Sequence, residues 1–313
     1  MKKCSICSLA VILILLIPEI NQAQSVTLIK TTQFNHFPSA SALLLHNNQL
    51  YVFGDDAKYV LILDSDQVIK DSILLFPAKE KRMSKNEKPD IEAATKVSFG
   101  NKTFLLGIPS FSTPKRNRLV AFPLETGKKH KIVKLTRAEE LIKRAGVNEV
   151  NIEGAAAIDH FIVLSNRANN TNKENVLLVI DQSNKNWNKL PPHSIAVQLP
   201  QQKNVLGISD LSYLKEKDLL LFTASTEATT SATSDGEIGE SYLGYITNTS
   251  QKLGEKIIKP DKLINLARTL KIGKEKIEAI SVEQFTGNEL ILHLAADNDD
   301  GKSSLFKIKM DLE

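Results

Sequence analysis

A unit with the same internal order recurs five times along the chain, and this repeat constrains the fold more than any other feature. Each copy opens with a polar head and continues as two short apolar segments separated by a turn. Segments this short, rich in Val, Ile, Leu and Phe and bounded by Asn, Gly, Asp and Lys, predict antiparallel hairpins. The five copies begin at Ser39, Asp90, Asn151, Gly207 and Lys276.

A third apolar segment follows each hairpin: YVLILD, RLVAFPL, NVLLVID, SYLGYIT and SLFKIKM. A fourth follows in four copies: VIKDSILL, KHKIVKL, HSIAVQL and EKIIK. A repeating four-stranded unit of roughly 40–50 residues is typical of a β-propeller blade. We therefore expect an all-β propeller with five blades. Six blades are the alternative, because some spacings between heads are long.

The fifth copy stops after its third strand, whereas SVTLIKTTQF, residues 25–34, is a strand that belongs to no copy. Pairing this segment with the last blade would close the ring and remove exposed strand edges, which otherwise invite association with other chains. We therefore predict that the N-terminal strand completes the last blade.

Two short helices are predicted between blades, where the spacing between heads is long. Each segment carries one apolar helical stripe. The stripes are Leu141, Ile142 and Ala145 in the first segment, and Leu263, Ile264, Ala267 and Leu270 in the second. Thr136, with Glu139 three residues later, is a candidate N-cap for the first helix.

Residues 1–23 have the pattern of a secretory signal peptide. Lys2 and Lys3 precede an apolar run at residues 9–17, which is too short to cross a bilayer because a crossing helix needs about 20 residues. Asn21, Gln22 and Ala23 form a candidate cleavage site. We expect an exported protein, in the bacterial periplasm or outside the cell, whose mature chain 24–313 forms a single propeller domain.

Cysteine content and charge exclude several classes of function. Cys4 and Cys7 both lie within the expected signal peptide, so thiol catalysis and cysteine zinc sites are excluded for the mature chain. A formal net charge of +4 is too mild to indicate nucleic-acid binding. The densest basic stretch, residues 78–88, is interpreted as a solvated loop. We expect a monomer without a membrane span, and a small molecule or a polymer as its ligand.

The heads predict where a site would lie. In a propeller blade, the head of the first strand and the end of the second lie side by side near the mouth of the central channel. Carboxylates at these positions should therefore ring the channel mouth. The candidate ligand site consists of Asp90, Glu92, Glu153, Asn166, Arg167, Asp210, Glu278, Asp297 and Asn298.

Clustered carboxylates repel one another unless a cation or an arginine compensates them. Calcium is the natural candidate because it takes about six to eight oxygen ligands, and Glu153, Glu278 and Asp297 are its candidate ligands. A competing interpretation is structural. The stretch DNDDG, residues 297–301, can form a turn, and the glutamates can accept backbone N–H groups and hold neighbouring blades together.

Three stretches resemble known propellers. NIEGAAAIDHFIVLSNR resembles the EGLA…SER element of secreted phytase-like esterases, and IEAISVEQF…AADNDDGKSSLFKI resembles their EGL…SDDN element. KPDIEAATKV…GIPSFSTPKRNRL more closely resembles a group of bacterial propellers with a KPDLEA…GSGS pattern. The resemblance implies that Asp90, Glu92, Glu153, Gly154, Asp297 and Asn298 occupy motif positions, whereas Asn166 replaces a motif glutamate.

Two functional hypotheses follow. The first is a binding module for a small ligand or a polymer, in which any calcium is structural. The second, which the resemblance implies, is a metal-dependent phosphoester or ester hydrolase. A cation held by Glu153, Glu278 and Asp297 would polarise the substrate and activate water, and Arg167 would stabilise developing charge. A purely structural surface protein is a third interpretation.

Overall fold

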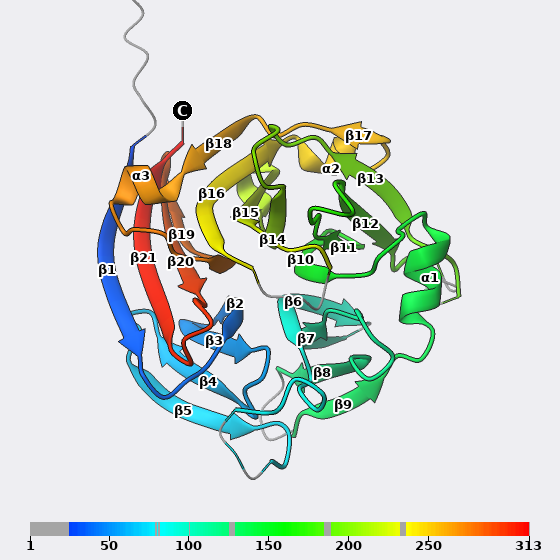
Figure 1. The fold of residues 1–313 in the computed structure, drawn as a ribbon, viewed down its shortest axis with the longest axis horizontal. Coiled ribbons are helices and arrows are strands. Elements are labelled where there is room, and N and C mark those ends of the chain that lie inside the picture. The colour runs from blue at the N-terminus through cyan, green and yellow to red at the C-terminus, as the bar shows by residue number, and fades with distance from the viewer. Residues whose placement is uncertain are drawn as a thin grey trace, which may run out of the picture.

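The computed structural model describes residues 25–78, 80, 82–99, 101–124, 129–184, 189–231 and 236–312. The described residues form a five-bladed β-propeller (Figure 1), which confirms the predicted all-β class and excludes the six-bladed alternative. The predicted signal peptide, residues 1–23, lies outside these residues.

Four blades follow one another along the chain, and the innermost strand of each blade comes first in sequence. Blade 1 contains β2 (Ala40–His46), β3 (Gln49–Gly54), β4 (Tyr59–Asp64) and β5 (Ile69–Leu74). Blade 2 contains β6 (Ile91–Phe99), β7 (Lys102–Pro109), β8 (Arg118–Pro123) and β9 (Lys131–Lys134). Blade 3 contains β10 (Ile152–Ile158), β11 (Phe161–Asn166), β12 (Asn175–Asp181) and β13 (His193–Val197). Blade 4 contains β14 (Leu206–Leu214), β15 (Leu219–Glu227), β16 (Ile238–Thr247) and β18 (Lys262–Asn265).

The last blade joins the two ends of the described chain. Blade 5 contains β19 (Ile277–Thr286), β20 (Glu289–Ala296), β21 (Ser303–Asp311) and β1 (Val26–Phe34). Strand β1 pairs antiparallel with β21, from Val26 opposite Met310 to Phe34 opposite Ser303. The predicted closure of the ring by the N-terminal strand is therefore confirmed.

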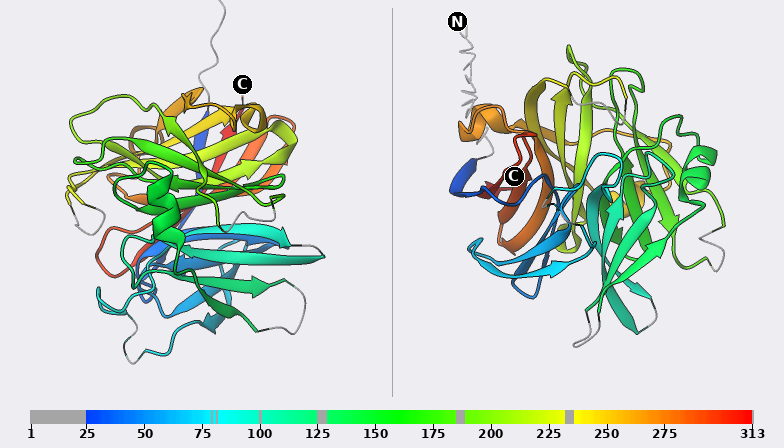
Figure 2. Two further views of the ribbon diagram at one scale, coloured as in Figure 1. Left: turned by 90° about the vertical axis from the view of Figure 1, so that its right-hand side faces the viewer. Right: turned by 60° about the horizontal axis from the view of Figure 1, so that its bottom comes forward.

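The core lies between the blades, where five apolar clusters each join two neighbouring sheets. Because both faces of each sheet are covered, the strands read as nearly continuous apolar runs rather than as alternating ones. In β15 every residue is buried. The side views in Figure 2 show the sheets twisted and packed face against face around the ring.

Both predicted inter-blade helices are present on the outer rim (Figure 1): α1 (Ala138–Arg144) before blade 3 and α3 (Leu266–Leu270) before blade 5. In α1, Leu141 and Ile142 are buried as predicted. The predicted Thr136 cap is wrong, because Arg137 occupies the N-cap position and makes no side-chain capping bond. The remaining short helices are α2 (Thr249–Lys252) and a 3₁₀ turn, η1 (Lys215–Lys217).

The fourth strand of blade 4 differs from the prediction. The segment EKIIK forms β17 (Ile257–Ile258), which pairs in parallel with β13 and so extends blade 3. Strand β18 completes blade 4 instead, and it contains Leu263 and Ile264, which were assigned to a helix. Pro260 separates the two strands because it has no amide hydrogen to donate to a ladder.

No helix among the described residues is both long and apolar enough to span a membrane.

Candidate functional site

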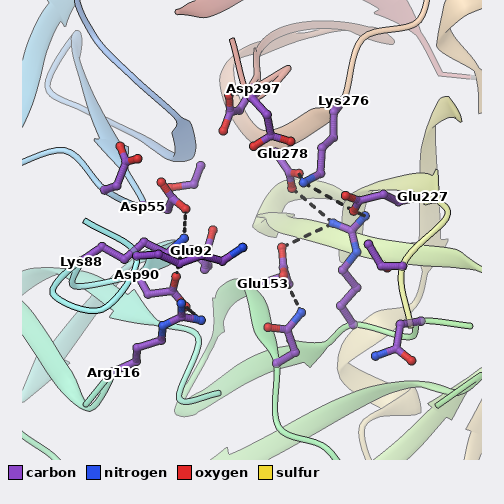
Figure 3. Close-up of a pocket in the computed structure, with 18 of the residues that line it drawn as sticks. Asp55, Lys88, Asp90, Glu92, Arg116, Glu153, Glu227, Lys276, Glu278 and Asp297 are labelled. Carbon is purple, nitrogen blue, oxygen red and sulfur yellow. Dashed lines mark hydrogen bonds and ion pairs between the residues drawn. The ribbon is translucent and has the colours of Figure 1, made fainter. Parts of the chain in front are cut away.

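A cavity of about 320 Å³ lies where the heads of the blades converge (Figure 3). Its described lining contains nine carboxylate side chains and six lysine or arginine side chains. Every blade contributes a carboxylate: Asp55, Glu92, Glu153, Glu227 and Glu278, from blades 1 to 5 in that order. The three glutamates predicted from the repeat heads, Glu92, Glu153 and Glu278, therefore meet at one place.

A β-bulge explains how the repeat directs side chains to this cavity. Each innermost strand has a register shift against its neighbour at the same place near its start. A bulge places an extra residue in one strand and re-aims its side chain, and bulges are frequent beside functional sites. The bulged residues are Ser41, Glu92, Glu153, Ser209 and Glu278.

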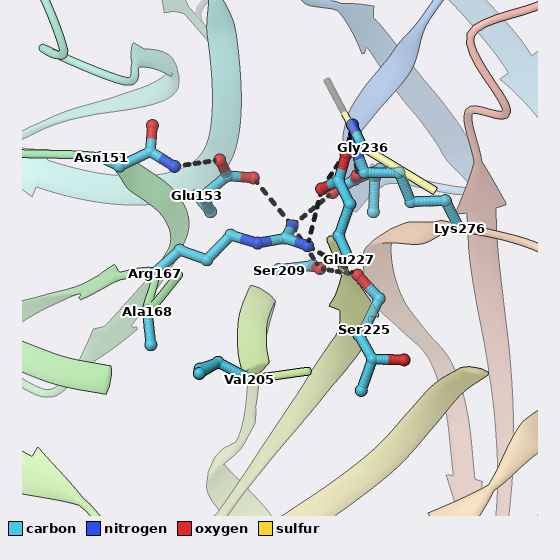
Figure 4. Close-up of polar contacts among 12 residues, drawn as sticks. Asn151, Glu153, Arg167, Ala168, Val205, Ser209, Ser225, Glu227, Gly236 and Lys276 are labelled. Carbon is cyan, nitrogen blue, oxygen red and sulfur yellow. Dashed lines mark hydrogen bonds and ion pairs between the residues drawn. The ribbon is translucent and has the colours of Figure 1, made fainter. Parts of the chain in front are cut away.

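Arg167 is the centre of the first ion-pair cluster (Figure 4). Its guanidinium lies 3.4 Å from Glu153, 3.4 Å from Glu227 and 3.3 Å from Glu278. The same group donates hydrogen bonds to Ser209 Oγ at 3.0 Å and to Ser225 Oγ at 2.8 Å. The arginine side chain is 7% exposed, so these contacts form largely away from water.

Lys276 completes this cluster, with Nζ 2.9 Å from Glu278 and 3.5 Å from Glu227. The two cations affect the two bulged glutamates differently. Burial raises the pKa of Glu153 to about 7 although Arg167 opposes the shift. Burial also disfavours the ionised form of Glu278, but Lys276 and Arg167 together outweigh it and lower the pKa of Glu278. The cavity thus holds two neighbouring carboxyl groups with opposite pKa shifts.

A second ion-pair cluster lies on the side of blades 1 and 2. Lys88 contacts Asp55, and its Nζ lies 2.8 Å from Asp90 Oδ1. Arg116 Nη1 lies 3.0 Å from Asp90 Oδ2. Arg82 pairs with Asp56. These contacts neutralise aspartates that the fold largely removes from water.

The interpretation of residues 78–88 as a solvated loop is therefore wrong for Lys88, whose side chain is 14% exposed, whereas Arg82 pairs with Asp56 but is 47% exposed. The loop is held against blade 1 by a hydrogen bond from Met83 N to Asp56 O at 2.9 Å. Charge compensation, rather than hydrophobicity, draws this basic stretch to the cavity.

One group of carboxylates has a separation suited to a metal ion. Oxygens of Asp55, Asp90 and Glu92 lie within 4.8 Å of one another. Lys88 Nζ contacts two of these three side chains, and the neighbouring carboxylates raise the pKa of Lys88 above its ordinary value although burial opposes the shift. An ammonium group of the chain itself therefore supplies positive charge at this point.

The three predicted metal ligands all line the cavity, but they differ in their partners. Glu153 and Glu278 both contact Arg167, which compensates their charge. Asp297 accepts a hydrogen bond from Asp299 N at 2.9 Å. It makes no ion pair with any residue that the structure describes.

Glu92 and Asp297 are two carboxyl groups of this cavity that form no ion pair with a described residue, although Lys88 acts electrostatically on Glu92 and Lys276 on Asp297. Within the described part of the chain, Glu92 forms neither an ion pair nor a hydrogen bond. Burial, followed by the charges of Asp90 and Glu153, raises the pKa of Glu92 well above its ordinary value. Burial, followed by the charges of Asp55 and Asp299, raises the pKa of Asp297 to about 7.

Three predicted site residues do not line the cavity and instead hold the heads in place. Asn166 Oδ1 accepts a hydrogen bond from Asn151 N at 2.7 Å. Asn298 Oδ1 accepts one from Lys276 N at 3.0 Å. The buried carboxylate of Asp210 accepts one from Ile280 N at 2.9 Å and so links blade 4 to blade 5. Asp210, rather than a glutamate head, therefore accepts a backbone N–H group and holds neighbouring blades together.

Charged lining residues outside the predicted set include Lys88, Arg116, Glu227 and Lys276. Lys88 and Arg116 lie in loops, outside the strand heads and strand ends from which the site residues were predicted. Lys276 and Glu227 occupy the start of one unit and the end of a second strand, the positions from which the other site residues were predicted.

A second, larger hollow of about 990 Å³ is lined by residues 196–203 and 257–263, beside β13, β17 and β18. It lies away from the bulged heads and contains none of the predicted site residues.

The sequence model of one family matches residues 36–310, which is most of the chain. The chain belongs to the family of unknown function DUF6929. No curated protein matches the sequence of this DUF6929 member. The family assignment does not support the resemblance to phytase-like esterases, which stays a hypothesis.

One solved structure with a TM-score above 0.5 shares the fold of this DUF6929 propeller at low identity, and a second is similar at a lower TM-score. The glutaminyl cyclase of Myxococcus xanthus is 10% identical, with a TM-score of 0.51, covering 93% of this chain and 98% of that one. The α-L-arabinanase of Cellvibrio cellulosa is 12% identical, with a TM-score of 0.44, covering 86% and 89%. At these identities the likeness concerns the fold alone.

Proposed function

We propose that this propeller is a binding module whose central cavity takes a small, highly polar ligand. The observation that carries the proposal is the convergence of one carboxylate from each of five blades on a cavity of about 320 Å³. Burying so many acids is costly, and replacing a buried ion cluster with apolar side chains is often neutral or stabilising for a fold. Their presence therefore favours a role in recognition over a role in stability.

The lining limits the chemistry of the ligand. An ionised carboxylate accepts hydrogen bonds and donates none. A surplus of carboxylates therefore suits a ligand that presents N–H or O–H donors. Among the described residues, no aromatic side chain lines the cavity. A ligand that depends on ring stacking is therefore disfavoured, and a compact polar molecule fits better.

The test is a thermal-shift screen of the mature protein with amines, polyols, amino acids, sugars and organic acids, followed by calorimetry of each ligand that stabilises it. A ligand present at 100 times its dissociation constant stabilises the folded state by about 2.7 kcal/mol. We expect Glu92→Gln to weaken binding. Glu289→Gln is the matched control, because Glu289 is 44% exposed and pairs with Lys309 away from the cavity. Equal binding by both variants would contradict the proposal.

A second candidate function is hydrolysis of an ester or phosphoester. It is favoured by the opposite pKa shifts of Glu153 and Glu278, since such a pair can divide acid and base roles between two carboxyl groups. Calcium at Glu153, Glu278 and Asp297 would polarise the substrate, but a dication there must share the first two carboxylates with Arg167.

Nitrophenyl esters and phosphate esters, assayed with calcium and with a chelator, test this second candidate. Turnover that is lost in both Glu153→Gln and Glu278→Gln would support hydrolysis. Ligand binding without turnover in either condition would leave the binding module as the function.

A further inference from the structure

The cavity has an imbalance of charge that identifies the kind of ligand it would hold. We propose that the ligand carries a primary ammonium or a guanidinium group, which binds between Glu92 and Asp297. This inference rests on the proposed binding function and specifies its ligand class.

Five of the six cationic side chains in the described lining pair with carboxylates of the cavity, and one of them is Arg82, which pairs with Asp56. Arg167 contacts three carboxylates and Lys276 contacts two. Lys88 contacts Asp55 and Asp90, and Arg116 also contacts Asp90. Glu92 and Asp297 are left without an ion pair in the described chain, so a cationic ligand would meet two carboxyl groups here that no described cation contacts directly.

Burial and position indicate that these two carboxyl groups belong to one subsite. Asp297 is 7% exposed, so its side chain is nine-tenths buried, yet it lines the cavity. Asp55 acts electrostatically on both Glu92 and Asp297 and therefore lies near both. One oxygen of Asp55 contacts Lys88, whereas Oδ1 is buried and has no hydrogen-bond partner among the described residues. Once ionised, the carboxyl groups of this subsite therefore offer hydrogen-bond acceptors.

The same cavity already holds nitrogen cations in the way that the proposal requires. Lys88 and Lys276 each place an ammonium group between two carboxylates, and Arg167 places a guanidinium among three. An ammonium offers three N–H donors to such acceptors, and a guanidinium offers five. The absence of aromatic rings from the described lining disfavours a quaternary ammonium, which is held by aromatic faces.

A divalent metal fits the subsite less well. Calcium takes about six to eight oxygen ligands, and the carboxylates nearest to Glu92 are Asp55 and Asp90, which Lys88 already contacts. A dication would therefore have to displace Lys88 or bear its repulsion. An organic monocation bears only half of that repulsion at the same distance, and it needs only the acceptors that the existing pairs leave unused.

Four compounds with a four-carbon skeleton test the charge requirement by calorimetry: n-butylamine, 1,4-diaminobutane, butane-1,4-diol and succinate. We expect the two amines to bind, and the diol and succinate not to bind. Glu92→Gln and Asp297→Asn should each weaken amine binding at least about tenfold, because each removes one charge from a largely desolvated pair. Glu289→Gln, the exposed control, should leave the affinity unchanged.

The outcomes separate this inference from the proposed function. If the diol or succinate binds in a Glu92-dependent manner and the amines do not, the inference is overturned while the binding function stands. If calcium chloride binds and abolishes amine binding by occupying Glu92 and Asp297, the subsite is a metal site and the inference is likewise overturned. If amines bind equally well to both variants and to the control, they bind elsewhere and the inference fails.

Discussion

The side chain of Arg167 crosses the backbone of Gly207 on its way into the cavity, so that a Cβ atom added at Gly207 would lie 2.6 Å from Arg167 Cγ. The head of blade 4 is therefore a glycine because the central cation of blade 3 passes over it. The first residue of the blade 4 unit, Gly207, therefore limits where the guanidinium of Arg167 from blade 3 can lie.

Gly207→Ala should destabilise the fold by about 1–3 kcal/mol, the usual cost of overpacking a buried contact. It should also weaken ligand binding, because Arg167 must move. Gly254→Ala is the matched control, since a Cβ there meets no atom within 4 Å. Urea unfolding of both variants measures the difference, and equal midpoints would show that Arg167 does not depend on Gly207.

Arg167→Met should cost about 3–5 kcal/mol of unfolding free energy, because it leaves buried carboxylates without their shared cation. Arg268→Met removes an exposed arginine that also pairs with a glutamate, Glu240, and should change stability by less than about 1 kcal/mol. Chemical denaturation of the two variants checks this contrast. If Arg167→Met lowers the free energy of unfolding no more than Arg268→Met does, the ion pairs of Arg167 are screened by water like those of an exposed arginine.

The raised pKa of Asp297 predicts how stability depends on pH. In the unfolded chain the carboxyl group loses its proton near pH 3.8, whereas in the folded chain it keeps the proton to about pH 7. The folded state therefore binds more protons between these values, and stability falls as pH rises through this window. Asp297→Asn should remove this loss, which amounts to at most about 4 kcal/mol above pH 7.

Thermal unfolding of wild type and Asp297→Asn at pH 5 and pH 8 measures this effect. The variant should gain more stability relative to the wild type at pH 8 than at pH 5, because only part of the loss has occurred at pH 5. A difference of the same size at both pH values would contradict the assignment of a raised pKa to Asp297.

The architecture was predictable from the sequence because the same pattern of polar head, apolar segments and turns recurs in each blade. Five polar heads, the alternation of apolar segments and turns, and the spare strand at residues 25–34 sufficed for blade number and closure. The path from β16 to β18 was not predictable in the same way. β17 pairs with β13 of another blade, and no local pattern distinguishes Ile257 and Ile258 from an ordinary fourth strand.

The site was predictable only in part. Glu92, Glu153 and Glu278 follow from their equivalent places in the repeat, and the structure adds that all three lie at bulges. The pairing of cations with these acids was not predictable. Lys88 lies in a loop, and Arg167 contacts carboxylates of other blades, whose distances the sequence does not give. The sequence also gave no means of distinguishing Asp210, which bonds the backbone of the next blade, from the acids that face the cavity.

Closure by β1 should be essential to the fold. Deleting residues 25–34 removes a strand paired along most of β21 and exposes an edge that can associate with other chains. We expect a large fall in melting temperature and concentration-dependent association, measured by calorimetry and light scattering. Ile29→Ser alters an exposed residue of the same strand, which is 51% accessible, and should have little effect. An unchanged melting temperature after the deletion would show that blade 5 is stable without β1 and would contradict this prediction.

The most direct measurement of the account is a crystal structure of the protein soaked with the tightest ligand from the binding screen. The account predicts density for that ligand inside the central cavity, with its donor groups within hydrogen-bond distance of the carboxyl groups of Glu92 or Asp297. Ligand density in the hollow beside β13 and β17, with the central cavity unchanged, would contradict it.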